Sequence, residues 1–314
     1  MSSMIATKTA SQPNTLLQPS FFYKSARQGM RDLLANTLTS PKEGVLLPAF
    51  IGWSQREGSG VFDPVLDSKA MSGFYNLHPD LSADVTDIER QLESGQYRVA
   101  VVIHYFGRTD PNIASVRALA DRHNVILVED LAHGFFSSLE KGPAGNFGHV
   151  SLFSLHKMFP LSEGGMIRYA DRRLIVSQAS TRPDLAEQVM SYDWTAISQA
   201  RRSNFIALSR LLAAMPECGS RFEMLWPALE DHDVPQSLPV RIMSGNRDGV
   251  YDGMNRDGFG MVSLYHTLIE PVRDDFLYLN QLSGEITNFP VHQDVPEASI
   301  PAMVASFRHH LNSV

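Results

Sequence analysis

The sequence predicts an α/β protein with a mostly parallel central sheet flanked by helices and a smaller C-terminal α+β domain. Residues 99–103 (VAVVI) and 125–128 (VILV) are continuous apolar runs, which are typical of strands buried on both faces. A helical pattern from residue 110 to 124 joins them, and such a strand–helix–strand unit implies parallel strands with a right-handed crossover. The 314 residues, 43% of them hydrophobic, are enough for two domains with a filled core.

The remaining elements are expected on both sides of this unit. We expect a flexible N-terminal arm over residues 1–20, a large domain over 21–184 and a smaller C-terminal domain over 185–314. Before the unit, the apolar spacing predicts helices at 22–38 and 84–92 and short strands at 44–50 and 73–77. After it, the spacing predicts a strand-like segment at 166–169, helical structure over 183–215, a strand at 237–243, a helix interrupted by glycines at 247–259 and a closing amphipathic helix at 300–311.

Composition excludes several classes of function. The formal net charge is −7 and no basic cluster occurs, which argues against a nucleic-acid or anionic-membrane partner. The single cysteine, Cys218, can form neither an internal disulfide nor a cysteine zinc site, and we expect no metal. No apolar run reaches the roughly 18 residues that a transmembrane helix requires. We therefore expect a protein of the cytoplasm.

Residues 153–165 (FSLHKMFPLSEGG) hold the main candidate for chemistry. Ser154 precedes Lys157 by three residues, and a turn-rich run then leads to Gly164 and Gly165. A lysine in a half-buried turn loses hydration, which lowers its pKa and frees its amine to form a Schiff base with an aldehyde. A Ser-x-x-Lys fragment is weak evidence by itself, because most lysines are solvated surface charges.

Other residues complete the set that a pyridoxal phosphate enzyme needs. Asp130 ends a buried strand and can pair with the pyridinium nitrogen, while His133 can reach the ring hydroxyl. Trp53 can stack on the ring. Ser154 and the N–H groups around Ala26 and Arg27, at the start of the first helix, can hold the phosphate. Singly, these residues have ordinary structural interpretations, such as a helix cap for Asp130 and core positions for His133 and Trp53.

Five motifs in order give the sequence a resemblance to the DegT/DnrJ/EryC1/StrS sugar aminotransferases, which are fold-type I pyridoxal phosphate enzymes. The resemblance covers the chain from about residue 25 to its end and is carried by residues 45–50, 102–107, 128–133, 153–165 and 289–294. It implies a fold-type I transferase with Lys157 as Schiff base and proton carrier, Asp130 at the pyridinium, His133 at the ring hydroxyl and Ser154 at the phosphate. It also implies a homodimer with sites at the subunit interface, glutamate as amino donor and a keto group of a nucleotide-linked sugar as acceptor, in amino-sugar, polysaccharide or secondary-metabolite biosynthesis.

The sequence departs from this family in two places. Members commonly carry a Gly-Tyr-Asn-Tyr-Arg type element that reaches across the dimer, and none occurs between Gly165 and Arg201. Many members also place the phosphate serine where this chain has Leu152, so Ser151 is a second candidate beside Ser154. Substrate contacts are expected from His104, Tyr105, Arg202 and His292.

Two alternatives stay open at this point, and a third is disfavoured by Lys157. A dehydratase of the same family would replace Lys157 by histidine, so the lysine favours transamination. A shortened chain can also act on a smaller keto acid or amino acid. The alternative outside enzymes is a regulatory or scaffold protein that keeps a degenerate aminotransferase fold.

Overall fold

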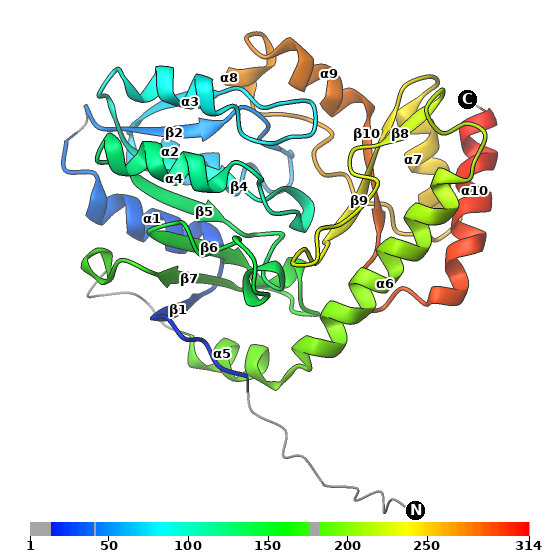
Figure 1. Ribbon diagram of the computed structural model, residues 1–314, viewed down its shortest axis with the longest axis horizontal. Helices are drawn as coiled ribbons and strands as arrows, with labels where there is room; N and C mark the ends of the chain where they lie inside the picture. The colour runs from blue at the N-terminus through cyan, green and yellow to red at the C-terminus, as the bar shows by residue number, and fades with distance from the viewer. Residues whose placement is uncertain (1–13, 41, 176–181, 314) are drawn as a thin grey trace, which may run out of the picture.

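The computed structural model describes residues 14–40, 42–175 and 182–313, which form a large and a small sheet with their helices (Figure 1). The first half of the chain builds the large sheet and its helices, with the bounds β1 Ser20–Tyr23, α1 Ala26–Thr37, β2 Gly44–Pro48, α2 Phe62–Ser68, β3 Met71–Tyr75, α3 Val85–Leu92, β4 Tyr97–Ile103, α4 Ile113–Arg122, β5 Ile126–Asp130, β6 Val150–Ser154 and β7 Gly165–Tyr169. The second half contains α5 Pro183–Ser191, α6 Trp194–Ala213, β8 Phe222–Met224, β9 Ser237–Ile242, α7 Arg247–Arg256, α8 Glu270–Arg273, α9 Leu277–Glu285, β10 Ile286–Pro290 and α10 Ile300–Ser313. Short 3₁₀ turns lie at Tyr105–Gly107, Ser137–Leu139, Leu155–Lys157, Arg172–Leu174 and Glu297–Ser299.

The large sheet has seven strands in the order β1-β7-β6-β5-β4-β2-β3. Strands β3, β2, β4, β5 and β6 are parallel, whereas β7 runs antiparallel to both β6 and β1. The chain order changes direction at β2, because β3 pairs with one edge of this strand and β4 with the other. Ligands of open α/β sheets gather at the carboxyl ends of the strands near such a switch point. The predicted fold class, a mostly parallel sheet with a smaller α+β part, is confirmed.

The small sheet is antiparallel, in the order β10-β9-β8, and α6, α7 and α10 pack with it on the right of Figure 1. The helix expected to be interrupted by glycines, α7, is continuous from Arg247 to Arg256. Helix α6 is 20 residues long and joins two cores. Its first turns pack Trp194 and Ile197 with Phe135 and Phe159, whereas Phe205 and later residues pack with the small sheet.

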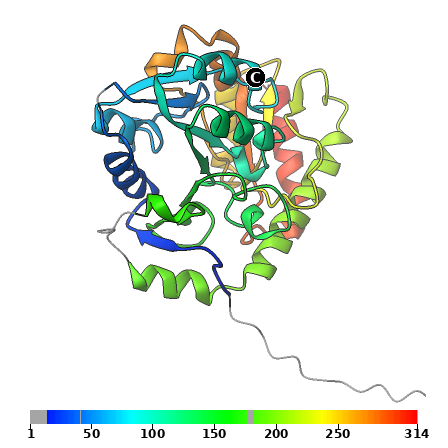
Figure 2. The ribbon, with the colours of Figure 1, turned by 60° about the vertical axis from the view of Figure 1, so that its left-hand side comes forward.

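Side-chain contacts link the start of the described chain to α5, and link α8 and α9 to the large sheet. Residues 1–13 of the expected arm lie outside the described part of the chain, but the Asn14 side chain donates hydrogen bonds to the carbonyls of Met190 and Tyr192 at the end of α5. Helices α8 and α9 belong to the second half of the chain, yet Val272 and Leu279 pack in the core of the large sheet. Turning the molecule by 60° shows α5 below β1, beside the start of the described chain (Figure 2). The division into domains at residue 184 stays a prediction.

Candidate active site

A cavity of about 380 Å³ lies where β5 and β6 end and α1 begins. Asp130, Ser154 and Lys157 line it from the sheet, and Ala26 and Arg27 line it from the first turn of α1. Because β7 is antiparallel to β6, the start of β7 lies at the same edge of the sheet as the ends of the parallel strands. The folded chain therefore brings five of the predicted residues to one cavity.

Lys157 ends the 3₁₀ turn that directly follows β6, and its side chain is half-buried. Its Nζ atom lies 3.1 Å from Nε2 of His133. Burial lowers the pKa of Lys157 below the usual 10.5, although the charges of Asp130 and Glu57 oppose that shift. The amine is thus held in the cavity in a form closer to neutral than a solvated lysine, which is the form that attacks an aldehyde.

His133 lies against Lys157 as a neutral imidazole. The backbone N–H of Phe106 donates a hydrogen bond of 3.2 Å to Nδ1, so the ring proton is on Nε2 and is directed to the lysine amine. Burial and the charge of Lys157 hold the pKa of His133 well below its usual value. The ring of Phe106 stacks on the imidazole with an interplanar angle of 15° and fixes its plane.

Asp130 is a buried carboxylate, and few protein groups offset the loss of its hydration. Its side chain accepts one hydrogen bond among the described residues, 2.8 Å from the N–H of Ala132 to Oδ1. Burial raises the pKa of Asp130, and the Ala132 hydrogen bond and the charges of Lys157 and His104 oppose this. A buried carboxylate is stable when a cation and further hydrogen bonds accompany it. The cavity in front of Asp130 suits a ligand with a positively charged N–H group.

The start of α1 forms the anion-binding end of the cavity. Ser25 caps the helix by accepting from the N–H of Gln28, which leaves the N–H groups of Ala26 and Arg27 without intrahelical partners. Gly165 permits this placement, because a Cβ atom there would lie 2.0 Å from the nitrogen of Ala26. Ser154 lines the same cavity, and its Oγ lies 3.3 Å from Nδ1 of His156.

The alternation of side chains along β6 separates the two serine candidates. Leu152 and Ser154 line the cavity, whereas the side chain of Ser151 points to the other face of the sheet, as expected for a period of two. Ser151 is 2% exposed and pairs across the sheet with Glu129 and Arg168. The structure thus places Ser154, and not Ser151, beside Lys157.

Several other predicted residues lie outside this cavity. His104 is fully buried and its Nε2 lies 2.7 Å from Glu129, while the Tyr105 hydroxyl donates a 2.6 Å hydrogen bond to the carbonyl of Phe50. Trp53 is 44% exposed and does not line the cavity. Arg202 donates hydrogen bonds to the carbonyls of Glu230 and Asp233. His292 lines a separate, smaller hollow, which also borders on Lys157.

The cavity lining also includes residues that sequence reasoning missed, among them Ala132, Glu57 and Tyr265. Tyr265 is the aromatic residue of the cavity wall, and its ring centroid lies 6.1 Å from that of His133. It packs directly over Gly52, where a Cβ atom would lie 1.9 Å from the Tyr265 ring. Ala132 could have been found from its place between Asp130 and His133. Tyr265 has no comparable signal, because the segment around it forms neither a helix nor a strand.

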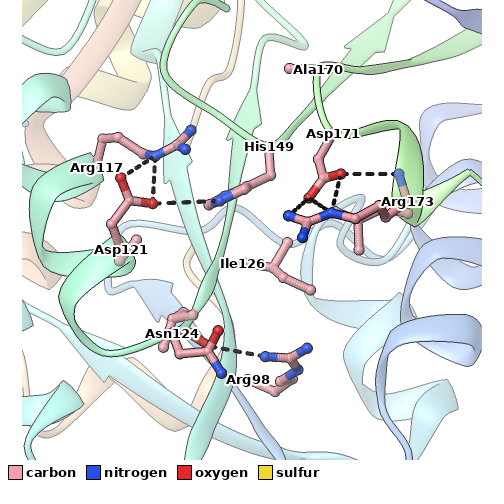
Figure 3. Close-up of a pocket in the computed structure, with 12 residues that line it drawn as sticks. Arg98, Arg117, Asp121, Asn124, Ile126, His149, Ala170, Asp171 and Arg173 are labelled. Carbon is pink, nitrogen blue, oxygen red and sulfur yellow. Dashed lines mark hydrogen bonds and ion pairs between the residues drawn. The ribbon is translucent and has the colours of Figure 1, made fainter.

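A larger hollow, of about 680 Å³, lies away from these residues (Figure 3). It is formed near the beginnings of β5 and β6, at the opposite edge of the sheet from Asp130. Four of its charged side chains are paired, Arg117 with Asp121 and Arg173 with Asp171, and Arg98 donates a hydrogen bond to the carbonyl of Asn124. The size of this hollow therefore does not make it the chemical centre.

Comparison with known proteins gives this site its context. Residues 60–182, which include Asp130, His133 and Lys157, match the model of the DegT/DnrJ/EryC1/StrS aminotransferase family. The match covers well under half of the chain. A GDP-perosamine synthase of Vibrio cholerae is 32% identical over 89 residues, which is 28% of this chain and 24% of that protein. An L-glutamine:2-deoxy-scyllo-inosose aminotransferase of Streptomyces kanamyceticus is 29% identical over 123 residues, 38% of this chain and 28% of that protein.

The fold extends the likeness beyond those segments. Spr1654 of Streptococcus pneumoniae, described as a candidate sugar aminotransferase and solved in its PMP form, superposes with a TM-score of 0.76 at 13% identity. The superposition covers 94% of this chain and 87% of Spr1654. The sequence alignments, in contrast, span only about a quarter of the length of the two curated relatives. Within the described residues, no helix is long and apolar enough to cross a membrane.

Proposed function

We propose that the protein is a pyridoxal phosphate-dependent aminotransferase that moves an amino group from an amino acid, in the first instance glutamate, to a keto sugar that is linked to a nucleotide. One observation carries the proposal: the Lys157 amine and the buried Asp130 carboxylate line one cavity whose far end is the start of α1. The match of residues 60–182 to the aminotransferase family supports the reaction class, and Spr1654 has been solved in PLP and PMP forms.

The residues present fit this cofactor. Asp130 offers a buried negative charge with one hydrogen bond from the protein, which suits a protonated pyridine nitrogen. The free N–H groups of Ala26 and Arg27 and the hydroxyl of Ser154 suit a phosphate. Pyridoxal phosphate, when bound, supplies an aldehyde that takes up the amino group and a ring that accepts electrons from the adjacent carbon.

The chain's own residues then have distinct tasks. Lys157 would hold the cofactor through its aldehyde, and its amine would move the proton at the reacting carbon. His133 directs its Nε2 proton to this amine and keeps it oriented. Asp130 would hold the ring nitrogen in its protonated form. The ring of Tyr265, together with Gly52, closes one wall of the cavity and limits the access of water.

A homodimer is also proposed, on the resemblance to the family. Exposed apolar side chains occur near the cavity, on the loop and helix that follow β2, at Trp53 and Leu66. A second subunit that covers this side would bury them and would border on the cavity. Light scattering coupled to size-exclusion chromatography measures the oligomeric state, and a monomer of 34.9 kDa at all concentrations would reject the dimer.

The test of the proposed function begins with the spectrum. Protein mixed with pyridoxal phosphate should show the absorbance band of a lysine-bound aldehyde, and borohydride should fix the cofactor to the peptide that contains Lys157. The variant Lys157→Ala should lose both signals and the amino transfer. Lys24→Ala, at a lysine whose side chain is 72% exposed, is the matched control and should keep them.

A panel of acceptors then defines the substrate. The enzyme is first charged with L-glutamate or L-glutamine, and keto sugars, nucleotide-linked keto sugars and keto acids are added while the return of the aldehyde band is followed. Return of the band only with keto acids would replace the sugar by a smaller substrate. A protein that shows no band at saturating cofactor is not an aminotransferase, and the scaffold alternative would take its place.

A further inference from the structure

Glu57 is a charged residue of the cofactor cavity that the proposed cofactor contacts do not use. It lines the cavity together with Lys157 and His156 and is itself exposed, so it lies at the cavity mouth. The other carboxylate of the lining is Asp130, which is buried and suits the ring nitrogen. A negative charge therefore remains at the mouth, and the cofactor does not account for it.

The backbone of the turn that carries Glu57 is held in place from several sides. Ser54 and Gly58 exchange two backbone hydrogen bonds, of 3.1 and 2.8 Å, and the N–H of Glu57 donates to Oγ of Ser54. Gly58 has a φ of +65°, and a Cβ atom there would lie 2.5 Å from Oδ2 of Asp63, so the turn needs glycine. Nη2 of Arg27, in α1, donates to the carbonyl of Glu57 at 2.6 Å. These contacts fix Glu57 at its place beside the cavity.

The side chain of Glu57, in contrast to its backbone, is free to bind a ligand. In the described part of the chain its carboxylate makes no hydrogen bond and no ion pair. The two arginines of the lining are already paired, Arg27 with Asp63 at 3.1 Å and Arg31 with Asp67 at 2.6 Å. A fixed backbone that presents an unpaired charged group is the arrangement that preorganises a binding residue.

The charge of Glu57 acts at the place of the reacting amine. Burial lowers the pKa of Lys157, and the charges of Asp130 and Glu57 oppose this. Burial and the charge of Lys157 lower the pKa of His156, and Glu57 again opposes the shift. An amine substrate must bring its nitrogen to the place of the Lys157 amine, and an aliphatic amine in neutral water is an ammonium ion. A cation that arrives there is attracted by Glu57 as the protonated lysine is.

We propose that Glu57 binds the ammonium group of the amine substrate as it enters the cavity, and that it selects cationic amines for reaction at Lys157. The inference rests on the proposed aminotransferase function and names the group that recognises one of its two reactants. The keto acceptor has no positive charge at its reacting carbon, so Glu57 does not attract it. Because the attraction acts at the cavity mouth, it raises the rate of association more than the final affinity.

Two small amines that differ in charge test this selection. Methylamine is a cation at neutral pH and hydroxylamine is neutral, yet both displace a lysine from an aldehyde. Protein loaded with pyridoxal phosphate is mixed with each amine, and stopped-flow absorbance follows the change of the aldehyde band. Glu57→Gln should slow methylamine by about two- to fivefold, the scale of an exposed ion pair, and leave hydroxylamine unchanged. Glu187→Gln, which removes the same charge from an exposed position of α5, is the control and should match the wild type.

Salt, a conservative variant and the apoprotein give further readouts. The difference between wild type and Glu57→Gln should shrink from 0.1 to 1 M salt, because the screening length falls from about 10 to about 3 Å. Glu57→Asp, which keeps the charge, should retain most of the preference for methylamine. In the apoprotein, Glu57→Gln lowers the pKa of Lys157 further, so uptake of pyridoxal phosphate should level off at a lower pH than in the wild type.

The outcomes separate this proposal from the proposed function. Equal slowing of both amines in Glu57→Gln, slowing of hydroxylamine alone, or no slowing would overturn the role of Glu57 and leave the aminotransferase in place. A preference for methylamine that depends on Glu57, in a protein that passes no amino group to any keto acceptor, would refute the proposed function and keep the ammonium site. A protein that takes up no cofactor has no reacting amine at this cavity, and both proposals would then be wrong.

Discussion

Nζ of Lys157 lies 3.1 Å from Nε2 of His133, and the backbone N–H of Phe106 occupies the other ring nitrogen of that histidine. Because Nδ1 accepts a hydrogen bond from the backbone N–H, Nε2 carries the ring proton and its N–H donates a hydrogen bond to the lysine nitrogen. A hydrogen bond donated to nitrogen stabilises the neutral amine. Two features therefore favour the neutral, reactive amine of Lys157: its burial and the hydrogen bond from His133.

This pair predicts a pH dependence for cofactor capture. The pKa of Lys157 is lowered, so the rate at which the apoprotein takes up pyridoxal phosphate should rise with pH and level off below 10.5. His133→Leu removes the donor, favours the protonated amine and should move that plateau to higher pH. Stopped-flow absorbance across a pH series measures both profiles. Identical profiles would show that His133 does not influence the amine.

Replacing Asp130 should slow the amino transfer without preventing the binding of the cofactor to Lys157. Asp130→Asn should retain the absorbance band, because Lys157 is unchanged, but lose the charge that keeps the ring nitrogen protonated. We expect amino transfer to slow by about 10²–10³-fold, the effect of removing one preorganised electrostatic partner. Asp121→Asn, at the exposed carboxylate beside Arg117 in Figure 3, is the matched control. Equal rates in the two variants would remove Asp130 from the mechanism.

The site residues that the sequence predicts correctly are those that lie in, or directly after, a predicted strand. Buried parallel strands are continuous apolar runs, and polar residues directly after them must lie at one edge of the sheet. That reasoning places Asp130 and Lys157 in a shared cavity, as the structure does. Ser154 and Ser151 are then separated by the alternation of side chains along β6.

For Arg201 and Arg202, the sequence contains the information that distinguishes a buried from a partly exposed arginine, but the prediction did not use it. The pair stands together in the sequence, and the second was the predicted substrate residue. Helical phase distinguishes them, because Ile197 and Phe205 place Arg201 on the buried stripe of α6 and turn Arg202 toward the loop at Glu230. The spacing of four residues from Ile197 to Arg201 to Phe205 would have identified Arg201 as the buried arginine from the sequence alone.

The position of Tyr265 could not be predicted, because the local sequence does not contain the information. Its segment has no periodicity, and its position depends on long-range backbone contacts, such as the bridge between Gly52 and Leu268. The same contacts bring the Tyr265 ring over Gly52, at the wall where stacking by Trp53 was expected. Pairing between distant irregular segments follows from the whole fold, so no local pattern could have revealed it.

Gly165 predicts a defect specific to the phosphate. In Gly165→Ala the new Cβ would lie 2.0 Å from the backbone nitrogen of Ala26, so the start of α1 must move. We expect a loss of about 1–3 kcal/mol in the free energy of unfolding, typical of overpacking. Affinity for pyridoxal phosphate should fall, whereas affinity for pyridoxal, which has no phosphate, should change little.

The control for that substitution is Gly284→Ala in α9, where a Cβ atom would meet nothing within 4 Å. This variant should be neutral or more stable by about 0.5–1 kcal/mol, because alanine is the better helix former. Urea unfolding and fluorescence titration measure the two quantities. An equal loss of affinity for both forms of the cofactor would indicate general disruption rather than a phosphate site at α1.

Glu129 predicts a loss of stability without a loss of chemistry. Its carboxylate is buried, lies 2.7 Å from Nε2 of His104 and accepts hydrogen bonds from the backbone N–H groups of Gly145, Phe147 and Gly148. Glu129→Gln weakens all of these contacts and leaves one amide N–H₂ group without an acceptor. We expect the free energy of unfolding to fall by about 3–5 kcal/mol, as when a buried pair is broken, while the folded protein still captures the cofactor at Lys157.

The pH dependence of that loss follows from the Glu129 pKa. Burial raises this pKa, but His104 and the backbone N–H groups outweigh it, and the net direction is below the usual 4.5. A depressed carboxylate pKa adds stability above the unfolded-state value, which is lost as the pH falls through the folded-state value. The difference between wild type and Glu129→Gln should therefore be full at neutral pH and shrink below pH 4.5. Glu187→Gln, at an exposed glutamate of α5, should match the wild type throughout, and a pH-independent difference in urea unfolding would show that Glu129 does not act through its charge.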